Sequence, residues 1–379
     1  MLNIAAIRSQ MPAVTARAYF NTGTFGPFPR VVRDAMEAHL QEAHERGRIG
    51  EDGYATWAQI EIDARSAIAT TVNASVGEIA VAHSTSDGLN LVVGGLEWEP
   101  GDEVLVGDNE HPGLLVPLEM MGQRRGIVTR VLPISDAPDP AGVIAEAITP
   151  RTRLVALSHV LWTTGRVLPV AKIAEVVHAA GALIIVDAAQ GPGCIPVDAP
   201  SLGVDFYTIS GQKWLCGPSG TGGLYVRPES LDLLTPAFPG YLTMEKHADG
   251  PRPWGSARRL DPGTSTLTAL AGLRAAVRWR SEIGWQAGHA RALALAADLR
   301  ARISGLDAVQ DIVVDNPSPL VALRVDGMPA DQVVAELDRR DVLVRTIPGT
   351  GITRVSVGLW NDESDLDRLV SALAEVTGQ

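Results

Sequence analysis

Apolar residues recur at two spacings in the first half of the chain. Residues 31–48 carry them at helical spacing, as at Val32, Met36 and Leu40, and residues 55–72 continue this pattern. Short apolar runs separated by amphipathic stretches follow, which predicts strands alternating with helices. The expected strands are residues 78–82, 103–106, 154–161, 182–186, 206–209 and 223–226.

The segment between two of these strands predicts how they are connected. Residues 170–180 have the pattern of an amphipathic helix, and Gly181 follows at the position where helices often end in a left-handed residue. Strand, helix and strand in this rhythm require crossover connections, so we expect an α/β fold with a mainly parallel sheet. Ligands of such sheets bind outside the carboxyl ends of the strands.

The pattern changes near residue 266. Two long helices, residues 267–280 and 286–303, precede a short strand, helix, strand, strand and helix series that ends near residue 376. A chain of 379 residues is longer than one hydrophobic core usually serves. We therefore expect an irregular N-terminal arm (1–20), a large domain (21–265) and a small α+β domain (266–379).

Composition narrows the class of protein. The net charge of −12 argues against a nucleic-acid partner, because phosphate binding needs a basic surface. No apolar stretch approaches the ~20 residues of a membrane span, and the start lacks the pattern of a secretory signal. Cys194 and Cys216 make no disulfide framework. These features predict a cytoplasmic enzyme without a membrane partner.

Asp187 and Lys213 each end an apolar run, 26 residues apart. A lysine amine can hold the aldehyde of pyridoxal phosphate (PLP) as a Schiff base, and a buried carboxylate can keep the pyridine nitrogen protonated. An aspartate there is often only a helix cap, and a loop lysine is normally a solvated charge. Here Ala-Ala-Gln190 follows the aspartate, and the glycine-rich, uncharged surroundings of the lysine would lower its pKa. The pair therefore predicts a PLP site.

Hydroxyl residues at the start of an apolar helix are candidates for the cofactor phosphate. Ser84, Thr85 and Ser86 follow a strand and open a helix, whose N-terminal donors suit a phosphate, although a plain helix cap is the alternative. Ser210 and Gln212, beside the lysine, would complete the cup. No histidine or cysteine motif has metal-ligand spacing, and the glycine cluster at 217–223 matches no nucleotide loop, so neither site is expected.

These segments resemble fold-type I PLP enzymes of the class V aminotransferase superfamily, which contains cysteine desulfurases, isopenicillin-N epimerase-like proteins and C-S lyases. The resemblance covers nearly the whole chain. It implies a large domain with a mainly parallel seven-stranded sheet beside the smaller α+β domain, and a homodimer whose active site is shared between subunits. It also implies a role for each matching residue. Ser84, Thr85 and Ser86 would bind the phosphate, Lys213 would form the Schiff base, and Thr264 would contact the partner's phosphate. Around the ring, His111 of the pair Glu110-His111 would stack and relay protons, Asp187 would contact the nitrogen, and Gln190 would lie near the hydroxyl.

Substrate contacts follow from the same resemblance. The segment 20–27, with Asn21, resembles the N-terminal substrate loop, and Arg354 matches the arginine that holds the substrate α-carboxylate. Segments 158–169, 211–218 and 344–347 look most similar to the cyanobacterial-type L-cysteine/cystine C-S lyases. In those enzymes two arginines bind substrate carboxylates, which implies this role for Arg345 and Arg354.

Four aromatic residues are weaker candidates. His159 is a candidate for the cofactor ring hydroxyl, but as a lone histidine it could equally be a core residue. Trp162 and Trp214 could line the substrate pocket, although tryptophans beside such turns are commonly only packing. Tyr241 could face the substrate or anchor its loop.

Departures from the family pattern shape the expected reaction. Residues 342–354 contain no cysteine, where desulfurases carry a mobile nucleophilic one, and Gln212 replaces a histidine. Cys216 and Cys194 are interpreted as small buried hydrophobes. We therefore expect β-elimination from L-cystine, L-cysteine or a related S-substituted cysteine, with Lys213 taking the α-proton, to give pyruvate, ammonia and a (per)sulfide.

Two alternatives remain open. An isopenicillin-N epimerase-like epimerase or an aminotransferase would use the same site with a different outcome. A protein of this fold that binds without turnover is disfavoured, because both Lys213 and Asp187 are present.

Overall fold

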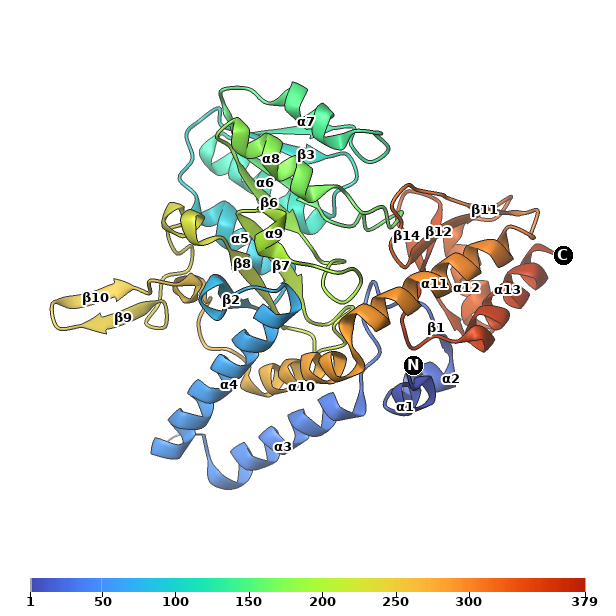
Figure 1. The fold of residues 1–379 in the computed structure, drawn as a ribbon, viewed down its shortest axis with the longest axis horizontal. Helices are drawn as coiled ribbons and strands as arrows, with labels where there is room; N and C mark the ends of the chain where they lie inside the picture. The colour runs from blue at the N-terminus through green and yellow to red at the C-terminus, as the bar shows by residue number, and fades with distance from the viewer. Residues whose placement is uncertain (1, 49, 379) are drawn as a thin grey trace.

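A seven-stranded sheet forms the centre of the larger part of the molecule (Figure 1). The structure is a computed structural model and describes residues 2–48 and 50–378. The strand order is β2-β8-β7-β6-β5-β3-β4, and only β8 runs antiparallel to its neighbours. The predicted mainly parallel sheet is therefore confirmed. The strands are β2 (Ile79–Ala82), β3 (Glu103–Gly107), β4 (Val128–Leu132), β5 (Thr152–Ser158), β6 (Leu183–Asp187), β7 (Phe206–Ser210) and β8 (Gly222–Val226).

Helices cover both faces of this sheet, so neighbouring residues of one strand enter different cores. In β6, Ile185 faces one core with α5 and α6, whereas Ile184 and Val186 face the other, with α4 (Glu51–Thr71), α7, α8 and α10 (Leu267–Ile283). A strand buried on both faces reads as a continuous apolar run, which is why the central strands were predictable. The crossover helices are α5 (Thr85–Gly95), α6 (Pro112–Arg125), α7 (Pro140–Ala147), α8 (Val170–Ala179) and α9 (Ala199–Leu202).

A second, smaller sheet lies near the C-terminus. Its four antiparallel strands have the order β11-β12-β15-β14. Three helices pack on it around their own apolar core, at the right of Figure 1. The elements are β11 (Val309–Asp311), β12 (Leu320–Val325), β14 (Arg345–Ile347), β15 (Ile352–Ser356), α11 (Trp285–Ile303), α12 (Ala330–Asp338) and α13 (Glu363–Thr377).

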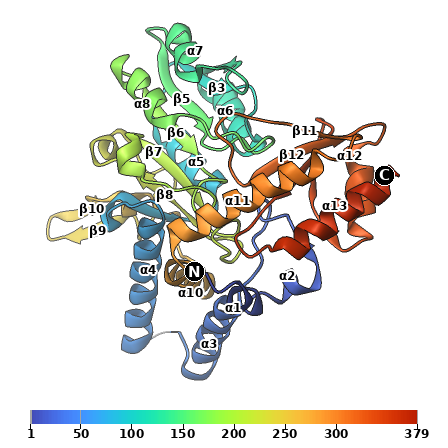
Figure 2. The same ribbon diagram turned by 45° about the vertical axis from the view of Figure 1, so that its right-hand side comes forward.

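One long helix shows where the two parts join. Helix α10 (Leu267–Ile283) packs against α3 (Arg30–Arg46) and α4 (Glu51–Thr71), and its Leu273 enters the core of the large sheet. Helix α11 then runs on to the small sheet, as Figure 2 shows. The division at residue 266 stays a proposal, and this packing favours a junction between α10 and α11, at Gly284.

The N-terminal arm is helical, so the prediction of an irregular arm was wrong. It forms α1 (Ile4–Ser9) and α2 (Pro12–Ala16), and then β1 (Ala18–Tyr19) pairs in parallel with β13 (Val342–Leu343). Helices this short show no clear periodicity. Burial of their apolar side chains against the rest of the molecule holds them in place, and Asn3 caps α1.

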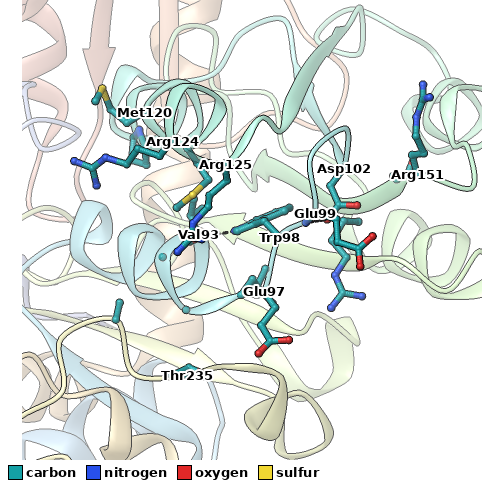
Figure 3. A pocket seen from close by; sticks show the side chains of 18 of the residues that line it. Val93, Glu97, Trp98, Glu99, Asp102, Met120, Arg124, Arg125, Arg151 and Thr235 are labelled. Carbon is teal, nitrogen blue, oxygen red and sulfur yellow. Dashed lines mark hydrogen bonds between the residues drawn. The ribbon is translucent and has the colours of Figure 1, made fainter.

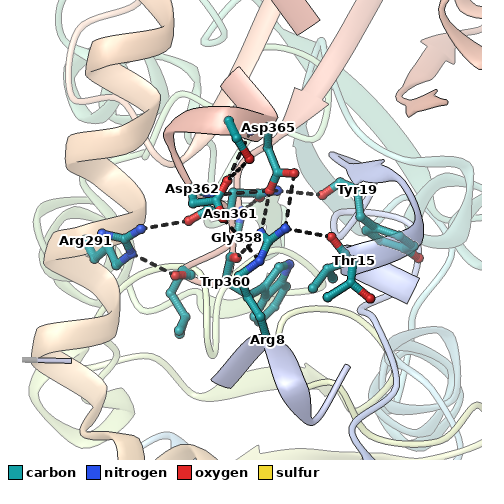
Figure 4. A network of polar contacts seen from close by, with 12 residues as sticks. Arg8, Thr15, Tyr19, Arg291, Gly358, Trp360, Asn361, Asp362 and Asp365 are labelled. Atoms are coloured by element: carbon teal, nitrogen blue, oxygen red, sulfur yellow. Dashed lines mark hydrogen bonds and ion pairs between the residues drawn. The ribbon is translucent and has the colours of Figure 1, made fainter. Parts of the chain in front are cut away.

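Arg8 fastens this arm to the small domain (Figure 4). Its Nη1 donates to Asp365 Oδ2 at 2.7 Å and to the Trp360 carbonyl at 2.8 Å, and its Nη2 donates to the Val14 carbonyl at 2.9 Å. Both charged side chains of this pair are largely buried.

No helix among the described residues is long and apolar enough to cross a membrane.

Replacing Arg8 with alanine should destabilise the protein by about 3 kcal/mol, because the Asp365 carboxylate would stay buried without its cation. The measurement is the urea midpoint of unfolding. Arg278→Ala is the matched control, since Arg278 forms an exposed ion pair with Glu282 and its loss should barely move the midpoint. Equal shifts in the two variants would contradict the assigned role of Arg8.

Candidate active site

Asp187 and Lys213 leave the same edge of the large sheet. Asp187 ends β6, Lys213 follows the end of β7, and the two strands are parallel neighbours. The carboxylate is buried and its Oδ1 accepts from the Ala189 N–H at 3.0 Å. Within residues 2–48 and 50–378, Oδ2 forms no hydrogen bond, so this oxygen is available to a ligand.

The Lys213 amine has a lowered pKa. Burial is the main cause, the Asp187 carboxylate opposes it, and the Arg354 and Arg345 guanidinium groups add to it; together they lower the pKa to about 8. In the described part of the chain the amine takes part in no hydrogen bond or close ion pair. An amine with this pKa is unprotonated in an appreciable fraction near pH 7, as a nucleophile or base must be.

His111 and Trp162 line the same space. The ring centroids lie 5.0 Å apart in an edge-to-face arrangement. His111 caps α6, and its Nδ1 accepts from the Gly113 N–H at 3.0 Å, which assigns the proton of the neutral ring to Nε2. Burial, followed by the charge of Lys213, lowers the pKa of His111. The imidazole is therefore neutral near pH 7.

The Glu110 side chain reaches the end of β5. It is buried, and it accepts from Ser158 N at 3.0 Å and Ser158 Oγ at 2.5 Å. Burial raises the pKa of Glu110 to about 7, although the Ser158 hydrogen bonds oppose the rise. Its side chain thus supports the strand end on which the site is built.

This raised pKa predicts a pH dependence of stability. Since Glu110 is protonated when folded up to about pH 7 but ionises near 4.3 when unfolded, its contribution is fully present below pH 4 and is lost as the pH rises through 7. Unfolding in urea should show that wild type loses about 2–4 kcal/mol relative to Glu110→Gln between pH 4 and pH 8. The exposed Glu119→Gln is the control, and a difference that does not vary with pH would contradict the assignment.

Hydroxyl groups gather at the start of α5. Ser84 is its N-cap and accepts from the Asp87 N–H at 3.2 Å, so the plain capping role applies to this serine. Thr85 and Ser86 open the helix. A Cβ placed on Gly113 would lie 3.0 Å from Ser86 Oγ and 3.1 Å from His111 Nδ1, so the helix start adjoins the His111 ring.

Ser210 and Gln212 lie beside this helix start. Ser210 pairs with Gly222 in the sheet, and a Cβ on Gly222 would lie 3.5 Å from the Cα of Ser84. The Ser210 hydroxyl donates to Gln212 Oε1 at 2.9 Å. This bond leaves the amide N–H groups of Gln212 as donors, which suits the phosphate cup that the sequence predicts.

Two arginines converge on one threonine. Arg345 and Arg354 are paired across β14 and β15, and both donate to Thr24 Oγ1, at 2.9 and 3.2 Å. Thr24 in turn donates to Asn21 Oδ1 at 2.7 Å, and Arg354 Nη1 donates to the Trp162 carbonyl at 2.7 Å. The predicted contacts Asn21, Trp162, Arg345 and Arg354 therefore meet in one place.

The charges of these arginines are uncompensated. Arg354 is almost completely buried, its Nε has no partner, and neither guanidinium forms an ion pair with a described residue. Burial, followed by the charge of Arg345, lowers the pKa of Arg354 to about 9. A buried cation needs an anion, so this pair is a site for a carboxylate.

Gln190 is fixed between two segments. Its Nε2 donates to the Gly23 carbonyl at 2.8 Å and its Oε1 accepts from Trp214 Nε1 at 2.6 Å. The sequence identified Gln190, but it missed Gly23 and Thr24, which lie inside the segment that resembles the substrate loop. Nothing in their own residue types marks them.

Three sequence candidates have other surroundings. Tyr241 and Thr264 bond each other at 3.1 Å on the surface, and neither bonds the residues around Lys213 within the chain as described. His159 is buried, and its Nδ1 lies 2.8 Å from the Tyr207 hydroxyl. Burial lowers the pKa of His159 to about 4, as expected for a core histidine.

Both cysteines are buried. Burial raises the pKa of the Cys216 thiol to about 12, and it also raises the pKa of Cys194. This agrees with the interpretation of both residues as small hydrophobes.

A large cavity lies elsewhere. A space of about 1070 Å³ opens where the carboxyl ends of α5 and α6 meet the segments that precede β3, β5 and β6 (Figure 3). Trp98, Asp102 and Arg125 are among the residues that line it. This is the amino edge of the parallel strands, opposite to the edge where such sheets bind ligands, so it is separate from the Lys213 site.

The sequence is similar to those of known proteins along nearly its whole length. Residues 18–369 match the family model described as aminotransferase class-V. The chain is 29% identical to an isopenicillin N epimerase of Streptomyces clavuligerus, over 95% of this chain and 94% of that protein. It is 31% identical to a probable cysteine desulfurase of Pseudomonas aeruginosa, over 97% and 96%.

Solved structures agree with these matches. The cystine C-S lyase C-DES, in complex with its reaction product cysteine persulfide, superposes with a TM-score of 0.92 at 31% identity, over 97% of this chain and 99% of that chain. A C-DES mutant with glycine covalently linked to its PLP cofactor gives a TM-score of 0.93 at the same identity and coverage.

Proposed function

The chain belongs to the aminotransferase class-V family, and from that premise we propose that it is a C-S β-lyase for L-cystine, L-cysteine or a related S-substituted cysteine. It is an enzyme, and its cofactor is PLP. The observation that carries the proposal is the uncompensated pair Arg345 and Arg354, in a segment without any cysteine.

The residues present fit the cofactor. The Lys213 amine has no hydrogen-bond partner among the described residues, so it is available to the aldehyde. Asp187 Oδ2 accepts no hydrogen bond from them either, so it is available to the ring nitrogen, and Thr85, Ser86 and Gln212 offer donors for the phosphate. When bound, the cofactor withdraws electrons from the substrate α-carbon.

The protein's own groups then bind the substrate and move protons. Arg354 and Arg345 hold its carboxylates through charge-assisted hydrogen bonds. Lys213, with its lowered pKa, accepts the proton from the α-carbon, and the neutral His111 is available to relay a proton to the leaving sulfur. The substrate thus loses a proton from Cα and a sulfur group from Cβ, and water completes the release of pyruvate and ammonia.

The absence of a reactive thiol separates this proposal from a desulfurase. A desulfurase takes sulfur onto its own cysteine, but residues 342–354 contain none. Cys194 and Cys216 are buried and their pKa values are raised, so neither is available as a nucleophile. The sulfur therefore leaves with the product. A disulfide substrate helps, because a persulfide is a better leaving group than a thiolate of higher pKa.

Pyruvate release tests the proposal. The enzyme is incubated with L-cystine, and pyruvate and persulfide are measured together with the configuration of the remaining amino acid. We expect equal amounts of pyruvate and persulfide. Inverted substrate without pyruvate would replace the lyase by an epimerase, and formation of an oxo acid that retains sulfur would replace it by an aminotransferase.

The active enzyme is proposed to be a homodimer. Helices α3 and α4 and the hairpin of β9 (Met244–His247) and β10 (Gly250–Pro253) project from the body of the molecule (Figure 1). Leu40, Tyr54 and Ile62 on the two helices are more than half exposed. Covering these apolar side chains would favour association, and it would let Thr264 reach the other subunit. Sedimentation equilibrium should give twice the chain mass.

A further inference from the structure

Trp214 follows the catalytic lysine, yet its side chain turns into the protein. Its ring packs among Val160, Cys194, Ile195 and Leu320 and is almost completely buried. Such a position would suit a purely apolar residue. The indole nevertheless makes a 2.6 Å hydrogen bond to Gln190 Oε1, so the ring also has a polar task.

The partners of Gln190 allow its amide one orientation. An indole N–H can only donate and a backbone carbonyl can only accept. Trp214 therefore requires the amide oxygen, and the Gly23 carbonyl, 2.8 Å from Nε2, requires the amide nitrogen. Because Gln190 is itself almost fully buried, a rotated amide would leave both contacts unsatisfied. The second N–H of the amide has no partner among the described residues.

Gly23 connects this amide to the arginine pair. A Cβ on Gly23 would lie 2.8 Å from Ser356 Oγ and 3.0 Å from Arg354 Nη2. The hydroxyl of the next residue, Thr24, accepts hydrogen bonds from both arginines. A displacement of the Gly23 carbonyl would therefore move the hydroxyl that holds the carboxylate site together.

We propose that Trp214 is a positioning residue that acts through Gln190. It fixes the amide so that one N–H holds the Gly23–Thr24 loop against the arginines and the other stays available to the oxygen of the cofactor ring. The substrate side of this inference rests on the proposed function, whereas the cofactor side rests only on PLP binding.

The test is Trp214→Phe in the PLP-loaded enzyme, which keeps an aromatic ring and removes the donor. We expect KM for L-cystine to rise about 10-fold with a smaller change in kcat, since one buried hydrogen bond is lost. The visible absorbance of the bound cofactor should titrate about half a pH unit higher, because an amide donor to the ring oxygen otherwise lowers that pKa.

A double-mutant cycle separates positioning from packing. If Trp214 acts through Gln190, Trp214→Phe should have little effect in a Gln190→Ala background. There it should change KM, and the acid dissociation constant read from the titration, each by less than about 2-fold. Trp360→Phe is the matched control, because Trp360 is equally buried but its Nε1 has no partner among the described residues. The proposal would be overturned if the effects of Trp214→Phe and Gln190→Ala on KM simply multiplied in the double mutant. It would also be overturned if Trp214→Phe and Trp360→Phe had equal effects.

The absorbance titration tests the role of Trp214 independently of the proposed lyase activity. It needs only bound cofactor, so it can be read even if L-cystine is not a substrate. An unshifted titration in Trp214→Phe would overturn the cofactor side of the proposal, whereas absent pyruvate in the wild-type enzyme would overturn only the lyase.

Discussion

Lys213→Ala should reduce pyruvate release from L-cystine by at least about 10³-fold, because the variant lacks both the covalent attachment for PLP and the amine that accepts the α-proton. Asp187 and the arginines would remain in place, so the substrate could still bind. The measurement is initial pyruvate formation, with the visible cofactor spectrum recorded on the same sample. The spectrum should lose its lysine-dependent band.

Lys172→Ala provides the control for this result. Lys172 lies on α8 and forms an exposed ion pair with Asp139, so its loss should leave both activity and spectrum unchanged. Residual pyruvate within about 10-fold of wild type in Lys213→Ala would show that another group accepts the proton, and the role of Lys213 would then be confined to holding the cofactor.

Arg354→Lys should lower kcat/KM for L-cystine about 10²- to 10³-fold, mostly through KM. A lysine keeps the charge but cannot provide the planar pair of N–H groups that holds a carboxylate bidentately. Arg354 is also fixed by the Trp162 carbonyl and by Thr24, so its geometry is more strongly set than that of Arg345. The same change at Arg345, which is half-buried, should cost about 10-fold less.

Arg324→Lys is the matched control, on the neighbouring strand β12 and exposed. It should leave kcat/KM within about 2-fold of wild type. If Arg354→Lys behaved like this control, the carboxylate site would have to lie elsewhere. If it lowered kcat without raising KM, the arginine would act in the transition state rather than in binding.

The strands that the sequence pattern predicted are more deeply buried than the strand that it missed. The predicted strands of the large sheet are buried on both faces, so each reads as an apolar run. Strand β4 was missed because it lies at the edge of the sheet, where Val128, Thr129 and Val131 are exposed and Arg130 is only partly buried. Its place is decided by pairing with β3, which a local pattern does not contain.

The site divides in a similar way. Lys213 and Asp187 could be predicted because each ends an apolar run and carries a charge, so position and chemistry coincide in one short segment. Thr24 could not, because its partners Arg345 and Arg354 are more than 300 residues away in the chain. The role predicted for Thr264 involves the second subunit of the proposed dimer. Neither this role nor a substrate contact of Tyr241 can be read from a single chain, so both stay predictions.

The burial of both cysteines has a chemical consequence for an enzyme of the proposed kind. A persulfide is a sulfur-transferring oxidant of thiols, and it would convert an accessible cysteine into a mixed disulfide or a protein persulfide. Cys194 is 2% exposed and Cys216 is fully covered, and the pKa of each thiol is raised, so neither presents a thiolate to the solution. Such a catalyst could work in its own product without being poisoned by it, and alkylating reagents should leave it active.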